Sequence, residues 1–142
     1  MKKIAIIGAG ISGLYLANLL EKEKDLHYKI FEKRSKFNLE EGYGIQLSVN
    51  SIKLLNKNGF KNIAATDIFF PKKVNFFKSN NPNKICDINL TQFDDDLNKY
   101  TTTKRSTLLK FLLKNIPKDK IKFNTILNNL DYSNNIKAYF SD

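Results

Sequence analysis

Three glycines near the start of the chain have the spacing of a phosphate-binding loop. Gly8, Gly10 and Gly13 stand in GAGISG, which fits the pattern G-x-G-x-x-G. The first glycine permits a tight turn, the second lets the backbone approach a pyrophosphate, and the third lets a helix pack closely. Ile11 and Ser12 complete the loop, whose N–H groups would lie at a helix N-terminus, where an anion is stabilised. These residues predict a site for a dinucleotide pyrophosphate.

Glu32 is the acidic residue that such a loop requires. It lies 19 residues after Gly13, close to the separation of about 20 at which a carboxylate accepts hydrogen bonds from ribose hydroxyls. Its charge would repel a 2′-phosphate, which favours FAD or NAD over NADP. Lys33 and Arg34 follow near the adenosine end of the predicted site. Arg105, the other arginine of the chain, could face the same ligand because a guanidinium grips phosphate or aromatic groups; a surface salt bridge is the alternative for both arginines.

A strand and a helix must hold this loop, and the apolar pattern predicts both. Residues 4–7 (IAII) predict a strand buried on both faces, as in a parallel sheet, and residues 28–32 (YKIFE) predict a second strand. The two enclose a helix, which completes a βαβ unit over residues 1–34. A secretory signal peptide is the alternative, but glycines interrupt the apolar run and no A-x-A site closes it. The helical face consists of Leu14, Leu16, Ala17 and Leu20.

The remaining chain predicts short strands and helices. After a polar loop at 37–41 and a turn at 42–44, a short run at 45–47 precedes a helix that Asn50 or Ser51 caps and Gly59 ends. Residues 69–77 and 85–90 predict two strands within a β-rich insertion at about 69–102. A helix is predicted next, which opens at Ser106 or Thr107 and ends at Pro117; its buried residues would be Leu108, Leu109, Leu112 and Leu113. A short strand is predicted at 121–123. Paired strands are predicted at 126–132 and 136–140, around Asn134 and Asn135.

The predicted fold class is therefore α/β: a Rossmann-like βαβ unit with a parallel sheet and inserted antiparallel strands, as an incomplete domain. No catalytic or metal-binding residue is predicted. We expect His27 at the surface, Asp94–Asp96 in an exposed acidic loop, and Cys86 as a buried, inert thiol. A single cysteine permits no internal disulfide and fits a cytoplasmic location.

The net charge of +10 is spread along the whole chain. We interpret it as solvated surface lysines, with a nucleic-acid partner as the alternative. The apolar run at 4–20 is shorter than the roughly 20 residues that a membrane span needs, so no membrane span is predicted.

Three segments resemble the FAD-dependent aromatic-ring and ubiquinone-biosynthesis monooxygenases, the single-component flavoprotein hydroxylases. GAGISGLYLANLL with IFEKR resembles their opening FAD-binding unit. GYGIQLSVNSIKLLNKNG resembles the segment in which a short strand leads to an Asn-containing helix start. KRSTLLKFLL resembles their Arg-x-x-Leu helix, whose arginine contacts the flavin cofactor.

The resemblance implies a set of cofactor-binding residues. Those that would line the pyrophosphate are Gly8, Gly10, Ile11, Ser12 and Gly13; Glu32 would bind ribose, Lys33 and Arg34 would lie near the adenosine, and Gly44 and Arg105 would lie against the cofactor. The implied chemistry is reduction of FAD by NADH or NADPH, followed by O₂-dependent hydroxylation of a small organic substrate, an aromatic one by analogy with the family.

Family members are much longer, so the resemblance further predicts that residues 1–142 are the N-terminal part of the FAD-binding domain, inactive alone, with a missing C-terminal part as a partner. Two alternatives stay open. One is a fragment of another FAD or NAD oxidoreductase, such as an amine oxidase or reductase. The other is a non-enzymatic Rossmann module that binds nucleotide or nucleic acid.

Overall fold

The computed structural model describes residues 2–39, 42–133 and 135–141. They form two compact units, the first from residues 1–41 and 108–142 and the second from residues 42–107. Glu40, Glu41 and Asn134, which the sequence analysis placed in loops, lie outside the described residues.

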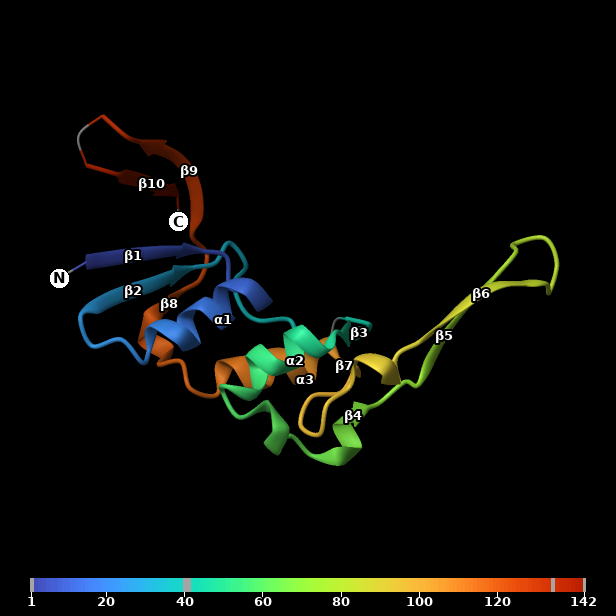
Figure 1. Ribbon diagram of the computed structural model, residues 1–142. Helices are drawn as coiled ribbons and strands as arrows, with labels where there is room; N and C mark the ends of the chain where they lie inside the picture. The colour runs from blue at the N-terminus through green and yellow to red at the C-terminus, as the bar shows by residue number, and fades with distance from the viewer. Residues whose placement is uncertain (1, 40–41, 134, 142) are drawn as a thin grey trace. The chain divides into compact units, whose positions relative to one another are not determined.

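The first unit contains a three-stranded parallel sheet with the order β1-β2-β8 (Figure 1). Strand β1 (Lys2–Ile7) pairs along its length with β2 (Leu26–Phe31), and the end of β2 pairs with β8 (Ile121–Lys122). Helix α1 (Ile11–Leu20) connects the first two strands and packs on them. The predicted βαβ unit and parallel sheet are confirmed.

Helix α1 covers one face of β1. Ile6 is buried against the helix, whereas Ile7 is 51% exposed on the opposite face, so the prediction of a strand buried on both faces was wrong. The alternation follows from the period of two in a strand. The helical face was also predicted imperfectly, because Leu16 is exposed and Asn18 is buried in its place.

Asn18 links α1 to α3 (Arg105–Leu113), which begins in the second unit and contributes residues from Leu108 onward to the first. The Asn18 side-chain amide donates to the carbonyl oxygens of Leu14 at 2.9 Å and Leu112 at 2.7 Å. A buried amide requires such partners because an unpaired polar group in a core costs free energy.

Three side chains join the end of α1 to the sheet. The Tyr28 hydroxyl donates to the Glu21 carboxylate, to which Lys120 Nζ also donates at 2.7 Å. Partial burial opposes ionisation of Glu21, but the hydrogen bonds from Lys120 and Tyr28 outweigh it and lower its pKa. Burial, reinforced by the Glu21 contact, raises the pKa of Tyr28. Lys120 also lies 4.4 Å from the centroid of the Tyr28 ring.

The first unit ends in an antiparallel hairpin of β9 (Ile126–Asp131) and β10 (Lys137–Ser141). Phe140 of β10 stacks on Phe31 of β2, with ring centroids 4.3 Å apart. Helix α3 ends at Leu113, before the predicted end at Pro117. Pro117 is instead the N-cap of the short helix η4 (Lys118–Lys120).

The second unit is built on an antiparallel sheet with the order β3-β7-β4. Strands β3 (Gly44–Leu47) and β4 (Ile68–Phe69) pair with opposite sides of β7 (Thr101–Lys104). Helix α2 (Val49–Asn56) buries Ile52 and Leu55. The short helices of this unit are η1 (Phe60–Asn62), η2 (Ala65–Asp67) and η3 (Thr91–Phe93).

The helix starts differ from those predicted. Ser48 caps α2, and its hydroxyl accepts from the Ser51 N–H at 3.5 Å, so neither Asn50 nor Ser51 is the cap. Helix α3 starts at Arg105, before Ser106, because β7 leads straight into it. Leu113 is only half-buried, since α3 ends at this residue.

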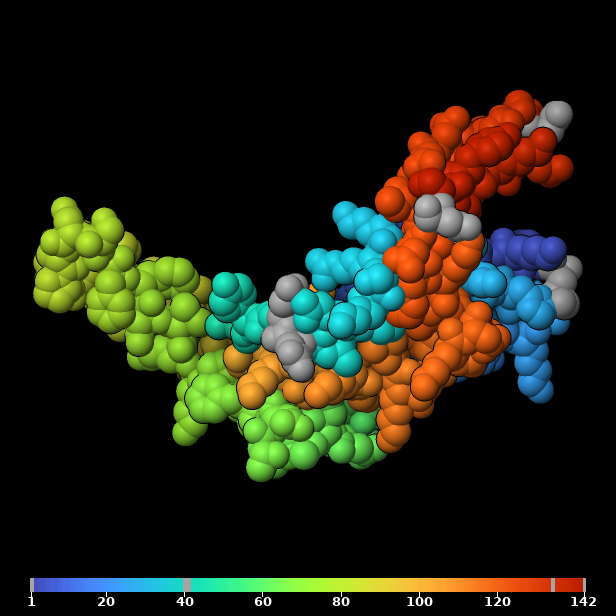
Figure 2. Space-filling model, turned by 180° about the vertical axis from the view of Figure 1, so that it is seen from behind, coloured from blue at the N-terminus to red at the C-terminus, as the bar shows by residue number. Residues whose placement is uncertain are grey.

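A hairpin of β5 (Lys73–Phe77) and β6 (Lys84–Asn89) projects from the rest of the second unit (Figure 2). The single strand predicted at 69–77 is interrupted at Pro71, which has no N–H to donate to a ladder. The prediction of a buried Cys86 was wrong: every residue of β6 is exposed, and Cys86 is exposed with them. An apolar strand sequence does not reveal whether a second layer covers it.

Candidate dinucleotide-binding site

Gly8 makes the turn between β1 and α1. Its φ of +95° lies in the region that favours glycine, and its N–H donates to the Phe31 carbonyl oxygen at 2.8 Å. This hydrogen bond ties the turn to the end of β2. The role of Gly8 is therefore conformational, since its N–H is already committed within the protein.

Gly13 is required by packing. A Cβ atom at this position would lie 2.1 Å from the Gly8 carbonyl oxygen and 3.2 Å from the Ile6 side chain. The absence of a side chain thus lets the first turn of α1 approach the β1 turn closely, as the third glycine of the motif was predicted to do.

Gly10 faces open space. It is the N-cap of α1, with no side-chain cap, and a Cβ atom built on it would meet nothing within 4 Å. The Gly10 carbonyl accepts from the Leu14 N–H at 2.9 Å, so the N–H groups of Ile11 and Ser12 precede the hydrogen-bonded ladder. With no acidic residue in the first turn, this cradle fits a pyrophosphate in both space and charge.

Glu32 lies beside the glycine loop. Its carboxylate accepts from the Ala9 N–H at 2.7 Å and from the Arg34 N–H at 3.0 Å. The separation of 19 residues after Gly13 therefore brings a carboxylate to the loop. The sequence analysis missed Ala9 because its contribution is a backbone N–H that has no residue signature.

The segment after β8 also reaches the end of β2. Glu32 N–H donates to the Lys122 carbonyl oxygen at 2.8 Å, and Thr125 N–H donates to the Glu32 carbonyl oxygen at 3.0 Å. Asn124, with φ +52°, donates its N–H to the Arg34 carbonyl oxygen at 3.0 Å. The side chains of Lys33 and Arg34 are exposed. Asn124 and Thr125 were not predicted, and only knowledge of the third parallel strand could have indicated them.

Gly44 and Arg105 lie together in the second unit. Gly44 starts β3 opposite Lys104, and the Arg105 N–H donates to the Tyr43 carbonyl oxygen at 3.2 Å. A Cβ atom on Gly42 would lie 3.2 Å from Arg105 side-chain carbons. The predicted cofactor-binding residues therefore form two groups, one in each unit.

Comparisons with known proteins agree with this geometry. The sequence pattern of the NAD(P)-binding Rossmann-like domain matches residues 6–38. The chain is 36% identical over 67 residues to 3-amino-4-hydroxybenzoate 2-monooxygenase from Streptomyces cremeus, which covers 46% of this chain and 16% of that enzyme.

Solved structures match nearly the whole chain. An FAD-containing monooxygenase from Photorhabdus luminescens superposes with a TM-score of 0.70 and 21% identity, over 99% of this chain and 35% of that one. The 2,6-dihydroxypyridine-3-hydroxylase from Arthrobacter nicotinovorans superposes with a TM-score of 0.73 and 15% identity, over 98% of this chain and 33% of that one. The chain has the fold of part of these two structures. It spans about a third of the length of these structures.

The second unit contains a cavity of about 610 Å³. One face of the β5–β6 hairpin supplies Val74, Phe76 and Ile88 to its wall, and polar groups come from β3 and the start of α2. Tyr100 donates its hydroxyl to Gln46 Oε1 at 3.2 Å at this cavity. The cavity thus has apolar walls with a few polar groups, as small-molecule sites commonly do.

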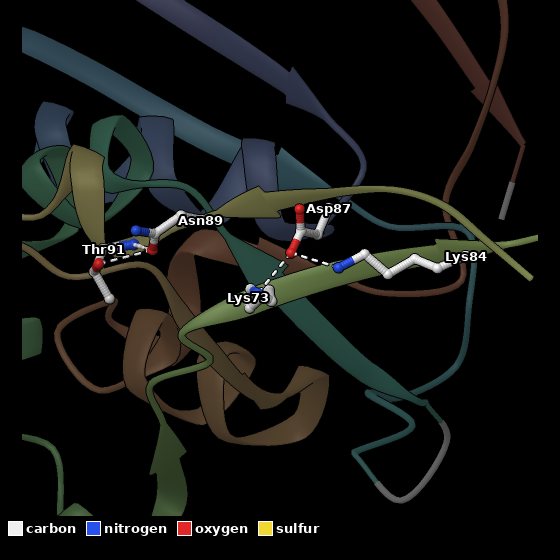
Figure 3. Close-up of polar contacts among 5 residues, drawn as sticks. All are labelled: Lys73, Lys84, Asp87, Asn89 and Thr91. Carbon is white, nitrogen blue, oxygen red and sulfur yellow. Dashed lines mark hydrogen bonds and ion pairs between the residues drawn. The ribbon is translucent and has the colours of Figure 1, made fainter.

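The opposite face of the hairpin is charged. Lys73 and Lys84 are both directed at one carboxylate oxygen of Asp87, at 2.5 and 2.7 Å, as Figure 3 shows beside Asn89 and Thr91. Hydrogen bonds from the two lysines lower the pKa of Asp87 to about 2. The carboxylate therefore stays ionised at neutral pH and is paired with both lysines within the hairpin.

The other side chains considered for chemistry have local partners. His27 is exposed, as predicted. Asp94 accepts from the Tyr100 N–H at 2.9 Å and Asp95 accepts from the Asn98 N–H at 2.7 Å, so these carboxylates order their own loop. Within residues 2–39, 42–133 and 135–141, no group of three or more His, Cys, Asp or Glu side chains is arranged to hold a metal ion, and no helix is long and apolar enough to cross a membrane.

Proposed function

We propose that this chain is the FAD-binding N-terminal part of a flavin-dependent monooxygenase. The observation that carries the proposal is the open cradle at Gly10, next to the carboxylate of Glu32. The fold of solved FAD-containing monooxygenases supports the choice of FAD. On this proposal, residues 1–142 are part of one FAD-binding domain, with the βαβ unit at 1–34 and the β-rich insertion at about 69–102.

The residues of the loop have distinct parts in this function. The N–H groups of Ile11 and Ser12 bind the pyrophosphate at the positive end of the α1 dipole. Gly10 leaves room for it, while Gly8 and Gly13 shape the turn.

Further groups hold the ends of the cofactor. The Glu32 carboxylate accepts hydrogen bonds from the ribose hydroxyls, and Lys33 and Arg34 lie near the adenosine. We propose that Gly44 and Arg105 also contact the cofactor. FAD, when bound, supplies the redox and oxygen chemistry, with NADH or NADPH as the reductant.

The substrate we propose is a small organic molecule, most simply an aromatic one. Because this chain corresponds to about a third of the length of the matched structures, we expect no hydroxylation by residues 1–142 alone. A cytoplasmic location is part of the same proposal.

A titration of the purified 142-residue chain with FAD, FMN and NADH tests the assignment. We expect saturable FAD binding that Gly10→Val abolishes, because the valine side chain enters the space of the pyrophosphate. Leu16→Val is the matched control, since Leu16 is an exposed residue of the same helix. Circular dichroism establishes that each variant is folded. A folded chain that does not bind FAD contradicts the proposal.

The matched Rossmann pattern is described as NAD(P)-binding, which supports a second candidate, a part of another FAD- or NAD-dependent oxidoreductase. Tighter binding of NADH than of FAD in the same titration would favour it. A non-enzymatic Rossmann module would instead be favoured by tight, steeply salt-dependent binding of DNA or RNA.

A further inference from the structure

The carboxylate of Glu32 is engaged by the protein itself, with no nucleotide present. One oxygen accepts from the Ala9 N–H at 2.7 Å and the other accepts from the Arg34 N–H at 3.0 Å. Ala9 is only 5% exposed, so its N–H cannot readily turn to water for a partner. A buried donor that loses such a charged acceptor pays a desolvation penalty.

The backbone that carries this carboxylate is held on both sides. Glu32 donates its N–H to Lys122 at 2.8 Å and accepts from the N–H of Thr125 at 3.0 Å. Thr125 is 2% exposed, and its hydroxyl donates to the Phe123 carbonyl oxygen at 2.9 Å. The acceptor for Ala9 is therefore anchored to the sheet through the segment that follows β8.

The hydrogen bond between Ala9 and Glu32 lies in the middle of the glycine loop. Ala9 lies between Gly8, whose N–H is tied to Phe31, and Gly10, which faces open space. Since the N–H groups of residues 8 and 9 are both committed within the protein, an anion must take its donors from the residues after them. Glu32 holds the peptide between Gly8 and Ala9, which lies just before the residues that supply those donors.

We propose that Glu32 is a positioning residue for the glycine loop, in addition to its contact with ribose. Its carboxylate holds the Ala9 N–H and so sets the loop for pyrophosphate before any nucleotide binds. This inference rests on the proposed nucleotide-binding function, and it assigns Glu32 a part that is independent of the ribose hydroxyls.

Two nucleotides separate the two parts of Glu32. ADP carries the ribose hydroxyls, whereas 2′,3′-dideoxy-ADP has the same pyrophosphate and lacks them. If Glu32 positions the loop, Glu32→Ala weakens the binding of dideoxy-ADP by about tenfold or more, the scale of one lost charged hydrogen bond. Glu32→Gln, which keeps one carbonyl oxygen as an acceptor, falls between Glu32→Ala and the unaltered chain.

A contact with ribose alone makes the opposite prediction. In that case the unaltered chain, Glu32→Gln and Glu32→Ala bind dideoxy-ADP equally and differ only toward ADP, which overturns the inference. Glu23→Gln is the control for the loss of a carboxylate, because Glu23 is an exposed residue in the connection between α1 and β2.

Hydrogen exchange of the Ala9 amide in the ligand-free chain gives a readout that needs no nucleotide. We expect exchange to be faster by tenfold or more in Glu32→Ala and by less in Glu32→Gln, with no change in Glu23→Gln. If the alanine variant fails to fold by circular dichroism, the glutamine variant decides. An unchanged Ala9 rate overturns the inference, whereas failure of the unaltered chain to bind ADP, with Ala9 exchange dependent on Glu32, overturns the proposed function and leaves the positioning contact established.

Discussion

Replacing Gly13 by alanine should destabilise the first unit even though alanine is the better helix former. The added Cβ atom would lie 2.1 Å from the Gly8 carbonyl oxygen, where ordinary contacts are 3.4–4 Å. Because this neighbour is backbone, the first turn of α1 must retreat from the β1 turn by roughly 1 Å in an interior with little free space.

The expected magnitude is a balance of two effects. Glycine-to-alanine in a helix is favourable by about 1 kcal/mol, whereas forcing an atom into a packed site typically costs about 1–3 kcal/mol or more. The 2.1 Å contact lies at the severe end, and a retreating helix also loses contact with Ile6. We therefore expect a net decrease of about 1–2 kcal/mol in the free energy of unfolding of the first unit.

Urea unfolding followed by the amide NMR signals of Ile6 and Ile30 reports on this unit separately. Gly10→Ser is the matched control, because it adds a Cβ atom where nothing lies within 4 Å and supplies a capping hydroxyl to α1. It should leave stability unchanged or slightly raised. An increase in stability for Gly13→Ala would refute the reasoning, since it would mean that the close approach can relax without cost.

Two further predictions concern the packing around the site. Asn18→Ala leaves the Leu112 carbonyl oxygen without its 2.7 Å donor and should cost about 1–3 kcal/mol in urea unfolding, whereas an unchanged midpoint would show that the link between α1 and α3 is dispensable. The pKa of Glu21 is lowered in the folded chain, where the hydrogen bonds from Lys120 and Tyr28 outweigh partial burial. The contribution of ionised Glu21 to folding stability is therefore fully present above its unfolded-state pKa and is lost as pH falls through its folded-state pKa. Glu21→Gln should therefore reduce the loss of folding stability at acid pH, measured by urea unfolding across the pH range. An unchanged pH dependence would show that Glu21 does not contribute to it.

Local patterns were sufficient to predict the turn and helix that contain the glycines. Gly8 and Gly13 have requirements set within a few residues, namely a positive φ and a close helix. The spacing of Glu32 was informative because a strand–turn–helix–strand unit has a nearly constant length.

Long-range contacts could not be predicted in the same way. The hydrogen bonds of the Glu32 backbone, donated to Lys122 and accepted from Thr125, depend on the register of a strand far along the chain. Cys86 was misplaced because alternation reveals the two faces of a strand and says nothing about what covers each. The capping error at α2 has a local cause, since serine and asparagine are about equally good caps and Ser48, Asn50 and Ser51 stand close together.

The anchoring of Glu32 by residues 122–125 has a consequence for biosynthesis. A ribosome makes the glycine motif among the first residues of the chain, but it adds the partners of the Glu32 backbone about 90 residues later. A nascent chain that stops before β8 carries the full motif without its support. If the chain binds a nucleotide as proposed, the glycine loop is therefore fully supported only after β8 has been made, long after its motif has been translated.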